Sequence, residues 1–362
     1  MKKNKKLWIL GAAVAIIVAL SFAFGKRAAV YDKPVIKVGL IIPLSGQYAQ
    51  LGSDMLAAVR VFERRLLERD TRFNYKFIPE DSMLEAARAV SAANKLISVD
   101  RVQAIISGES AIGLAINPIA ERAEVVHVAI ATDDNAARGR FNFTLATPAD
   151  LEAQKLVRQF VKNKVKRIGI VSMNQGGYIA QRDALVREAG KVGIETVANV
   201  MTNMGDRDFR IIIMRMLAAK PDIVVVQLHT PELQIFIRQF REQNKTVLLT
   251  AMDTFSYMED KSLIEGMYYV DLVAPLEWFN EEMRIETGRN APWLTELQYA
   301  ALDIVVSGFE YAGPDTGAVA DAIVGMTFDS SIGEFHFNAA GVAQTKPSLR
   351  VVREGVAVLI EE

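Results

Sequence analysis

Residues 36–65, IKVGLIIPLSGQYAQLGSDMLAAVRVFERR, are the most informative part of this chain. A short, continuous apolar run ends at Pro43, Ser45 and Gly46, and a pattern with the period of an α-helix follows. This order predicts a buried parallel strand, a turn and a helix. Such a turn exposes unpaired backbone N–H groups at the positive end of a helix dipole, where open α/β sheets bind small ligands. The stretch therefore indicates an α/β protein with a site for a small, anionic group.

Strand and helix patterns alternate along the chain from residue 34 onward. Helical patterns, such as those at residues 83–98 and 151–162, separate short runs that are rich in Val and Ile. This alternation is typical of doubly wound parallel sheets with helices on both faces. A weak echo of the first strand and turn at residues 166–177, KRIGIVSMNQGG, indicates two lobes of similar build. The predicted strands are residues 36–42, 75–79, 102–106, 126–129, 167–171, 196–200, 223–227, 246–249 and 266–269.

Length, charge and cysteine content limit the classes of protein to consider. A chain of 362 residues exceeds what one hydrophobic core usually organises, so two lobes of roughly 100–200 residues each are expected. Six Lys or Arg and no acidic residue lie in residues 1–27, which leaves residues 28–362 with a net charge of −7. That acidic balance argues against a nucleic-acid partner. The absence of Cys excludes disulfides and thiolate metal sites.

The N-terminus has the pattern of an export segment. Four lysines within residues 2–6 precede the apolar run LWILGAAVAIIVALSFAFG, residues 7–25. As a signal peptide, this run ends in the small residues of a cleavage site. As a membrane anchor, it just reaches the roughly 20 residues that span a bilayer. Both alternatives stay open for residues 1–33, and both place the globular part in the periplasm or on the outer face of the cytoplasmic membrane.

Residues 43–52, PLSGQYAQLG, resemble the opening of the type I periplasmic binding proteins of the leucine/isoleucine/valine class. Further pieces of that family's pattern follow in the same order, each of them weak alone. The order and spacing of these pieces identify the chain as a member of the family. The pieces are EDS at residues 80–82, IISGES at 105–110, PIAE at 118–121, HVAIAT at 127–132, TLATPAD at 144–150 and IGEFHFNAAG at 332–341.

The resemblance implies two α/β lobes that are joined by three strands and close on a solute like a hinge. One lobe is expected at residues 34–146 plus 274–328, and the other at residues 147–273 plus 329–362. The strand and turn at residues 332–341 are expected to close the second lobe. The partners implied are a small-molecule ligand and an ABC permease in the inner membrane, with no cofactor.

Loops at the carboxyl ends of the first-lobe strands hold the candidate binding residues Ser45 and Gln47, Ser110, and Ala131 and Thr132. Hydroxyls and backbone N–H groups at helix starts suit a carboxylate, which needs several donors in a small volume. Alternatively, Ser45 and Ser110 are only helix N-caps, because Ser is favoured at that position.

On the second lobe, the resemblance places Tyr178 where the family has a cleft tyrosine, and His229 and Thr230 where aromatic residues line the cleft. It places Asp253 near an acid that receives the ammonium group of amino-acid ligands, although Met252 fits that position as well. From the residues alone, Tyr178 could be an exposed loop aromatic, His229 a buried histidine with satisfied hydrogen bonds, and Asp253 a cap of the next turn.

The ligand class stays open, because Leu51 stands where many family members have an aromatic residue. Amino acids, small carboxylates, amides and aromatic acids all remain candidates. The chain has three histidines and no cysteine, and it contains neither a metalloprotease motif nor a nucleotide-binding motif. These residues give no basis for catalysis, so no enzymatic activity is expected. The sequence predicts an exported solute-binding protein that delivers a small molecule to an ABC permease. The alternative is a membrane-tethered ligand-sensing receptor domain, which retention of residues 7–25 favours.

Overall fold

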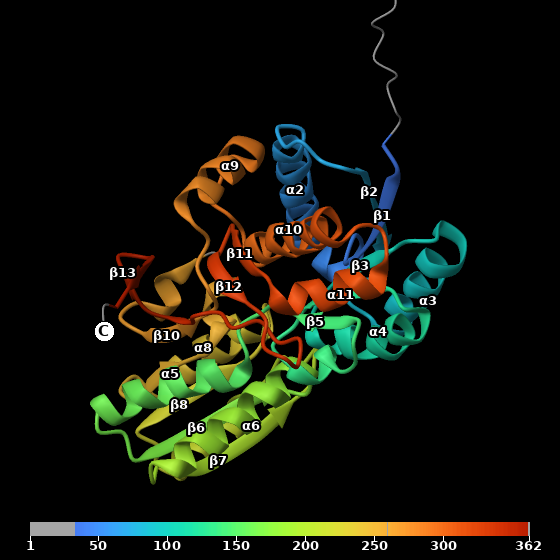
Figure 1. Cartoon of the computed structure of the whole chain (residues 1–362). Helices are drawn as coiled ribbons and strands as arrows, with labels where there is room; N and C mark the ends of the chain where they lie inside the picture. The colour runs from blue at the N-terminus through green and yellow to red at the C-terminus, as the bar shows by residue number, and fades with distance from the viewer. Residues whose placement is uncertain (1–32, 259, 361–362) are drawn as a thin grey trace, which may run out of the picture.

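The computed structural model describes residues 33–258 and 260–360, which form two α/β lobes (Figure 1). The first lobe combines the N-terminal part of the chain with helices from its C-terminal third, and the second contains most of the middle of the chain. Each lobe has its own parallel sheet with helices packed on both faces. The doubly wound, two-lobed fold predicted from the sequence is therefore confirmed.

The first-lobe sheet has five parallel strands in the order β2-β1-β3-β4-β5. Val38, Leu40 and Ile42 of β1 belong to the core cluster that includes α2 and α10, whereas Ile41 belongs to the cluster beneath α3 and α4. Burial of both faces explains why β1 is apolar without interruption. The elements are β1 (Val35–Ile42), α2 (Ala49–Leu66), β2 (Asn74–Asp81), α3 (Ala86–Lys95), β3 (Ala104–Gly108), α4 (Ser110–Ala123), β4 (Val126–Ile130), β5 (Asn142–Thr144), α10 (Thr295–Ala312) and α11 (Thr316–Gly325).

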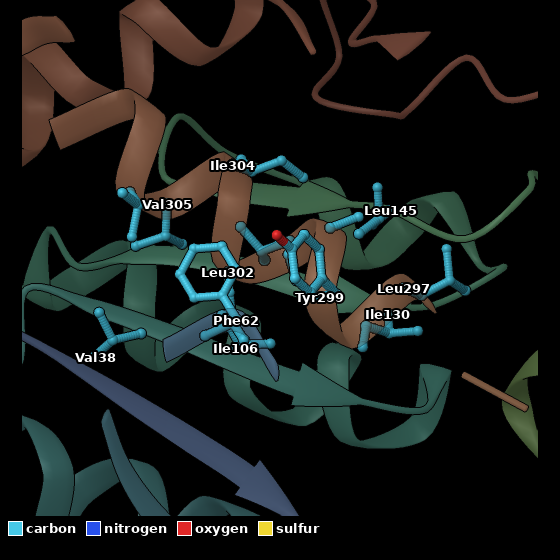
Figure 2. Close-up of a cluster of buried hydrophobic side chains, with 14 of the residues drawn as sticks. Val38, Phe62, Ile106, Ile130, Leu145, Leu297, Tyr299, Leu302, Ile304 and Val305 are labelled. Carbon is cyan, nitrogen blue, oxygen red and sulfur yellow. The ribbon is translucent and has the colours of Figure 1, made fainter. Parts of the chain in front are cut away.

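The main core of the first lobe lies between its sheet and the helices α2 and α10. Figure 2 shows the strand side chains Ile106 and Ile130 in one cluster with Leu302 and Leu297 of α10. The rings of Phe62 on α2 and Tyr299 on α10 meet edge to face, with centroids 5.0 Å apart. Segments from opposite ends of the chain therefore share one core, which ties the C-terminal helices to the first lobe.

The second-lobe sheet has four parallel strands in the order β7-β6-β8-β9. Along β8, Val224 and Val226 belong to the cluster that includes α7 and α8, while Ile223 and Val225 belong to the cluster that includes α5 and α6. This strand is therefore also buried on both faces. The elements are α5 (Ala149–Lys162), β6 (Arg167–Met173), α6 (Gly176–Lys191), β7 (Glu195–Thr202), α7 (Arg210–Ala218), β8 (Ile223–Gln227), α8 (Glu232–Gln243) and β9 (Leu248–Thr250).

The hairpin of β11 and β12 near the C-terminus belongs to the first lobe, whereas the sequence predicted that residues 332–341 belong to the second. Phe335 and Phe337 lie in the first-lobe core with Phe328, and the rings of Phe328 and Phe335 stack at 5.4 Å. The expectation that residues 332–341 close the second lobe is therefore wrong, because this aromatic hairpin packs on the first. The other boundaries of the division stay predictions. The elements are β10 (Tyr268–Asp271), α9 (Glu277–Thr287), β11 (Thr327–Ser330), β12 (Gly333–His336), β13 (Ser348–Arg353) and β14 (Val356–Leu359).

The chain passes between the lobes near residues 146–149, 270–272 and 343–349, where neighbouring residues change from one lobe's core to the other's. In the second lobe, β10, β13 and β14 form an antiparallel sheet. Within the part of the chain that the structure describes, no helix is long and apolar enough to cross a membrane. The expected signal peptide or anchor lies almost wholly outside that part.

His127 on β4 links three strands of the first lobe through buried hydrogen bonds. Asn142 donates its amide N–H to Glu121 Oε2 at 2.9 Å, so its Oδ1 accepts the proton of His127 Nδ1 at 2.9 Å. The Ser107 hydroxyl then donates to His127 Nε2 at 2.9 Å. This network holds a neutral imidazole, and burial lowers the pKa of His127 to about 4.

We predict that this histidine makes the protein less stable in mild acid. Between pH about 6.5 and about 4, His127 binds a proton in the unfolded chain but not in the folded protein. The free energy of unfolding therefore decreases as the pH is lowered through this range, by up to about 3 kcal/mol. His127→Gln removes this contribution. The difference in unfolding free energy between wild type and variant, measured with urea at pH 4, 5, 6 and 7, should shrink toward low pH. A difference that is constant with pH contradicts the prediction.

Candidate functional site

A cavity of about 90 Å³ lies between the lobes, where the N-termini of α4 and α6 face each other. Its lining includes Ser110 and Thr132 from the first lobe and Tyr178 and Asp253 from the second. These residues follow the carboxyl ends of β3, β4, β6 and β9, at the edges of the two parallel sheets. That is the place where α/β sheets bind ligands.

Glycines at the start of α6 allow the two lobes to meet closely. A Cβ atom on Gly177 would lie 3.0 Å from Ser110 Oγ and 3.3 Å from Thr132 Oγ1. A Cβ atom on Gly176 would lie 3.6 Å from Leu114 Cδ1. At Gly176 and Gly177 the first turn of α6 thus presents only backbone to the opposite lobe, and the two lobes are in contact there.

The hydroxyl of Ser110 holds two first-lobe loops together. Ser110 Oγ accepts a hydrogen bond from the backbone N–H of Thr132 at 3.2 Å and lies 3.5 Å from Thr132 Oγ1. Ser110 is the first residue of α4, and the N-cap position belongs to Glu109. The alternative that Ser110 is only an N-cap is therefore wrong. The Ser45 side chain also makes no capping hydrogen bond, and it donates instead to Asp81 Oδ2.

Glu109 joins the cavity from the turn between β3 and α4. Its φ of 71° is unusual for a residue other than glycine, and its backbone N–H donates to the carbonyl of Ile130 at 3.0 Å. Burial, together with the charge of Asp253, raises the pKa of Glu109 to about 7. Glu109 is not among the candidate residues predicted from the sequence, although it lies between Gly108 and Ser110 at a strand-to-helix turn.

A buried network of amides and carboxyls holds Asp253 in place on the second lobe. The amide nitrogen of Gln181 donates to Asp253 Oδ1 at 3.0 Å and to Glu152 Oε2 at 2.8 Å. Gln227 donates to Gln181 Oε1 at 2.7 Å and accepts from the backbone N–H of Met252 at 2.9 Å. Both hydrogens of the Gln181 amide therefore go to carboxyl oxygens. Burial, with a smaller contribution from the charge of Asp253, raises the pKa of Glu152 well above its usual value.

His229 lies at the interface of the lobes rather than in the cavity lining. Its ring meets Tyr48 of the first lobe edge to face at 4.9 Å and Trp293, which lines the cavity, at 6.2 Å. Tyr48 Oη lies 3.8 Å from Met204 Sδ of the second lobe. Burial raises the pKa of Tyr48 to about 12 and lowers that of His229. These aromatic side chains pack behind Trp293 in the cavity wall, and they connect the two lobes.

Four of the ten candidate residues line this cavity, and the other six lie outside its lining. Ser110, Thr132, Tyr178 and Asp253 are brought together as expected from their positions in the sequence. The others are exposed Ser45 and Gln47 beside η1 (Gly46–Tyr48), Leu51 against the first-lobe core, buried Ala131, and the neighbouring pair His229 and Thr230.

The chemistry of the lining is that of binding. The described residues contain no group of three His, Cys, Asp or Glu side chains that could hold a metal ion. The lining combines the hydroxyls of Ser110 and Thr132 with the carboxyls of Glu109 and Asp253. The site therefore offers partners for both acceptor and donor groups of a small molecule.

Comparison with known proteins agrees with this geometry. The sequence profile of the family described as "Periplasmic binding protein" matches residues 35–353. A Leu/Ile/Val-binding protein homolog 3 from Brucella melitensis is 24% identical over 346 residues, covering 90% of this chain and 92% of the relative. The resemblance seen in the sequence is thereby confirmed.

Solved structures share the fold over nearly the whole chain. A leucine-binding protein from Thermotoga maritima has a TM-score of 0.83 and 20% identity, covering 90% of this chain and 98% of the other. A solute-binding protein of an ABC transporter from R. palustris, in complex with benzoate, has a TM-score of 0.82 and 17% identity, covering 90% and 95%.

We predict that a side chain at position 177 keeps the lobes apart. Gly177→Leu places its side chain against Ser110 and Thr132, so any solute that raises the melting temperature of the wild type should bind at least tenfold more weakly by calorimetry. Gly190→Leu is the matched control, since no atom lies within 4 Å of a Cβ there. Equal affinities for the two variants would show that closure does not bring α6 against α4.

Proposed function

We propose, since the chain belongs to the periplasmic binding protein family, that its two lobes capture a small solute and deliver it to an ABC permease. The observation that carries this proposal is the cavity, which residues from both lobes line at the facing N-termini of α4 and α6. Relatives in the family bind solutes and are not enzymes. The family also supports a place for the globular part outside the cytoplasm.

Closure follows from contacts that a solute makes with both lobes. A solute favours the closed state only to the extent that it binds this state better than the open one. The first lobe supplies the Ser110 hydroxyl and the backbone at the start of α4, and the second supplies Asp253 and the backbone of Gly177. A permease that recognises the closed lobes would thus distinguish the loaded protein from the empty one.

The size of the cavity limits the solute. A cavity of about 150 Å³ in another protein holds benzene, and the closed cavity here is about 90 Å³. Amino acids and related small carboxylates or amides of few heavy atoms fit this limit best. The R. palustris structure contains benzoate. To hold a ligand of that size, the two lobes of this protein would have to stay further apart than they are here.

A scattering experiment tests capture between the lobes. A library of amino acids, their amides and short carboxylates is first screened for solutes that raise the melting temperature. With such a solute, the radius of gyration of the protein should decrease, because the lobes close around it. If calorimetry shows that one solute binds per protein and the radius of gyration still does not change, the hinge mechanism is refuted.

Localisation separates transport from the second candidate function, a membrane-tethered receptor domain. The apolar residues 7–25 between lysines are the observation that favours a tether. We expect the globular part in the extracytoplasmic fraction, with an N-terminus near Phe24 after cleavage. Full-length protein in the membrane fraction would favour the receptor, and full-length protein in the cytosol would contradict export altogether.

A further inference from the structure

Glu109 brings a carboxyl oxygen without a partner into the wall of the cavity between the lobes. Its Oε1 atom is buried and has no hydrogen-bond partner within residues 33–258 and 260–360. The described part of the cavity lining also contains no Lys, Arg or His side chain that could pair with it. Buried polar atoms nearly always have a hydrogen-bond partner, because leaving one unpaired is costly. A molecule that enters the cavity can supply the missing donor.

Backbone N–H groups of both lobes lie in the same cavity wall. Ala111 and Gly177 line the cavity from the first turns of α4 and α6, where N–H groups have no acceptor within their own helix. The two turns lie close together, since a Cβ atom on Gly176 would be 3.8 Å from the nitrogen of Ala111. Glu109 is the N-cap of α4, directly before its first turn. This part of the wall therefore combines N–H donors with a carboxyl acceptor.

The combination does not suit a carboxylate ligand. A carboxylate has only acceptor atoms, so the N–H groups could bind it while the carboxyl group of Glu109 would repel it. A helix N-terminus by itself favours an anion, and this is the reason why the sequence indicated an anionic group. The acid at the N-cap of α4 reverses that preference.

The backbone of the first lobe holds this part of the wall in an uncommon conformation. Leu84, Glu109 and Leu294 all line the cavity, and their φ angles are 63°, 71° and 67°. Residues other than glycine adopt positive φ only where the surrounding structure requires it, and such residues cluster at ligand sites. The acceptor and two apolar side chains of the wall are therefore presented by backbone that the fold constrains.

On these observations we propose that Glu109 is a solute-binding residue, which accepts a hydrogen bond from the N–H of a primary amide. The carbonyl oxygen of the same amide accepts from the backbone N–H groups at the starts of α4 and α6. This inference rests on the proposed function and names its solute class. A primary amide carries one acceptor and one donor side by side, and it brings no net charge into the cavity. Leu84 and Leu294 contact the apolar remainder of the solute.

Calorimetry with pairs of solutes that have the same shape tests the amide preference. The pairs are propionamide with propionate and isobutyramide with isobutyrate. Burial raises the pKa of Glu109 to about 7, so binding is measured at pH 8, where the carboxylate form prevails. Each amide should bind about tenfold more tightly than its carboxylate, or better, because the carboxylate leaves the buried acceptor unpaired. Propylamine should bind more weakly than propionamide, since it offers no acceptor to the N–H groups.

Two variants separate a binding role of Glu109 from a structural one. Glu109→Gln replaces the negative charge with an amide that can also donate, so propionate should gain affinity and the preference for propionamide should be lost. Glu124→Gln changes an exposed acid at the other end of α4 and should keep the preference of the wild type. If Glu109→Gln weakens both probes equally, or changes neither, Glu109 does not select the solute and the proposal is wrong.

The remaining outcomes also decide the proposal. Tighter binding of propionate or of propylamine than of propionamide to the wild type would overturn it, and so would failure of both amides to bind at millimolar concentration. Without a solute, Glu109→Gln should melt at pH 8 no lower than the wild type, because it removes a buried charge that lacks a partner. A lower melting temperature would contradict the proposal, since the chain itself would then satisfy the carboxyl group. Compaction of the protein by another solute of the wider library would leave the proposed function intact.

Discussion

The close approach of two helix N-termini is the constraint on which the site depends. The first turn of α6 has no side chain where it meets Ser110 and Thr132, because Gly177 stands there. A Cβ atom there would lie only 3.0 Å from Ser110 Oγ, so a bulky side chain would press against the first lobe. The glycine turn also leaves the backbone N–H groups at the start of α6 near those at the start of α4. Two positive helix ends therefore face one another, and acidic groups close by offset their field.

Acidic residues from both lobes line the cavity. Gln181 donates hydrogen bonds to both Asp253 and Glu152, which ties these two carboxyls to one amide. The backbone of Glu109 is also fixed, because its N–H donates to the carbonyl of Ile130, the last residue of β4, while its φ is positive. Such strain is found where surrounding structure and function both require it. Asp253 is therefore held in position by the second lobe itself.

The sequence predicted the features that depend on neighbouring residues, and it did not predict those that depend on contacts between residues far apart in the chain. The strands β1, β3, β6 and β8 were predictable, since an apolar run that is buried on both sides has a local signature. The hairpin of β11 and β12 was assigned to the wrong lobe, because its position depends on aromatic contacts such as Phe328 with Phe337 and on the first-lobe core. Ser110 was selected from a strand-to-helix turn and Tyr178 from the family resemblance, and both lie in the cavity lining. Glu109 was not among the candidates, because only the tertiary fold brings it into one cavity lining with Asp253.

A crystal structure of the protein purified from its host tests the central claim most directly, since it shows what the closed lobes retain. The account predicts one small molecule in the cavity between α4 and α6, in contact with residues of both lobes such as Ser110 and Asp253. A closed structure whose cavity holds only water, or a solute bound at another surface while the lobes stay apart, would contradict it.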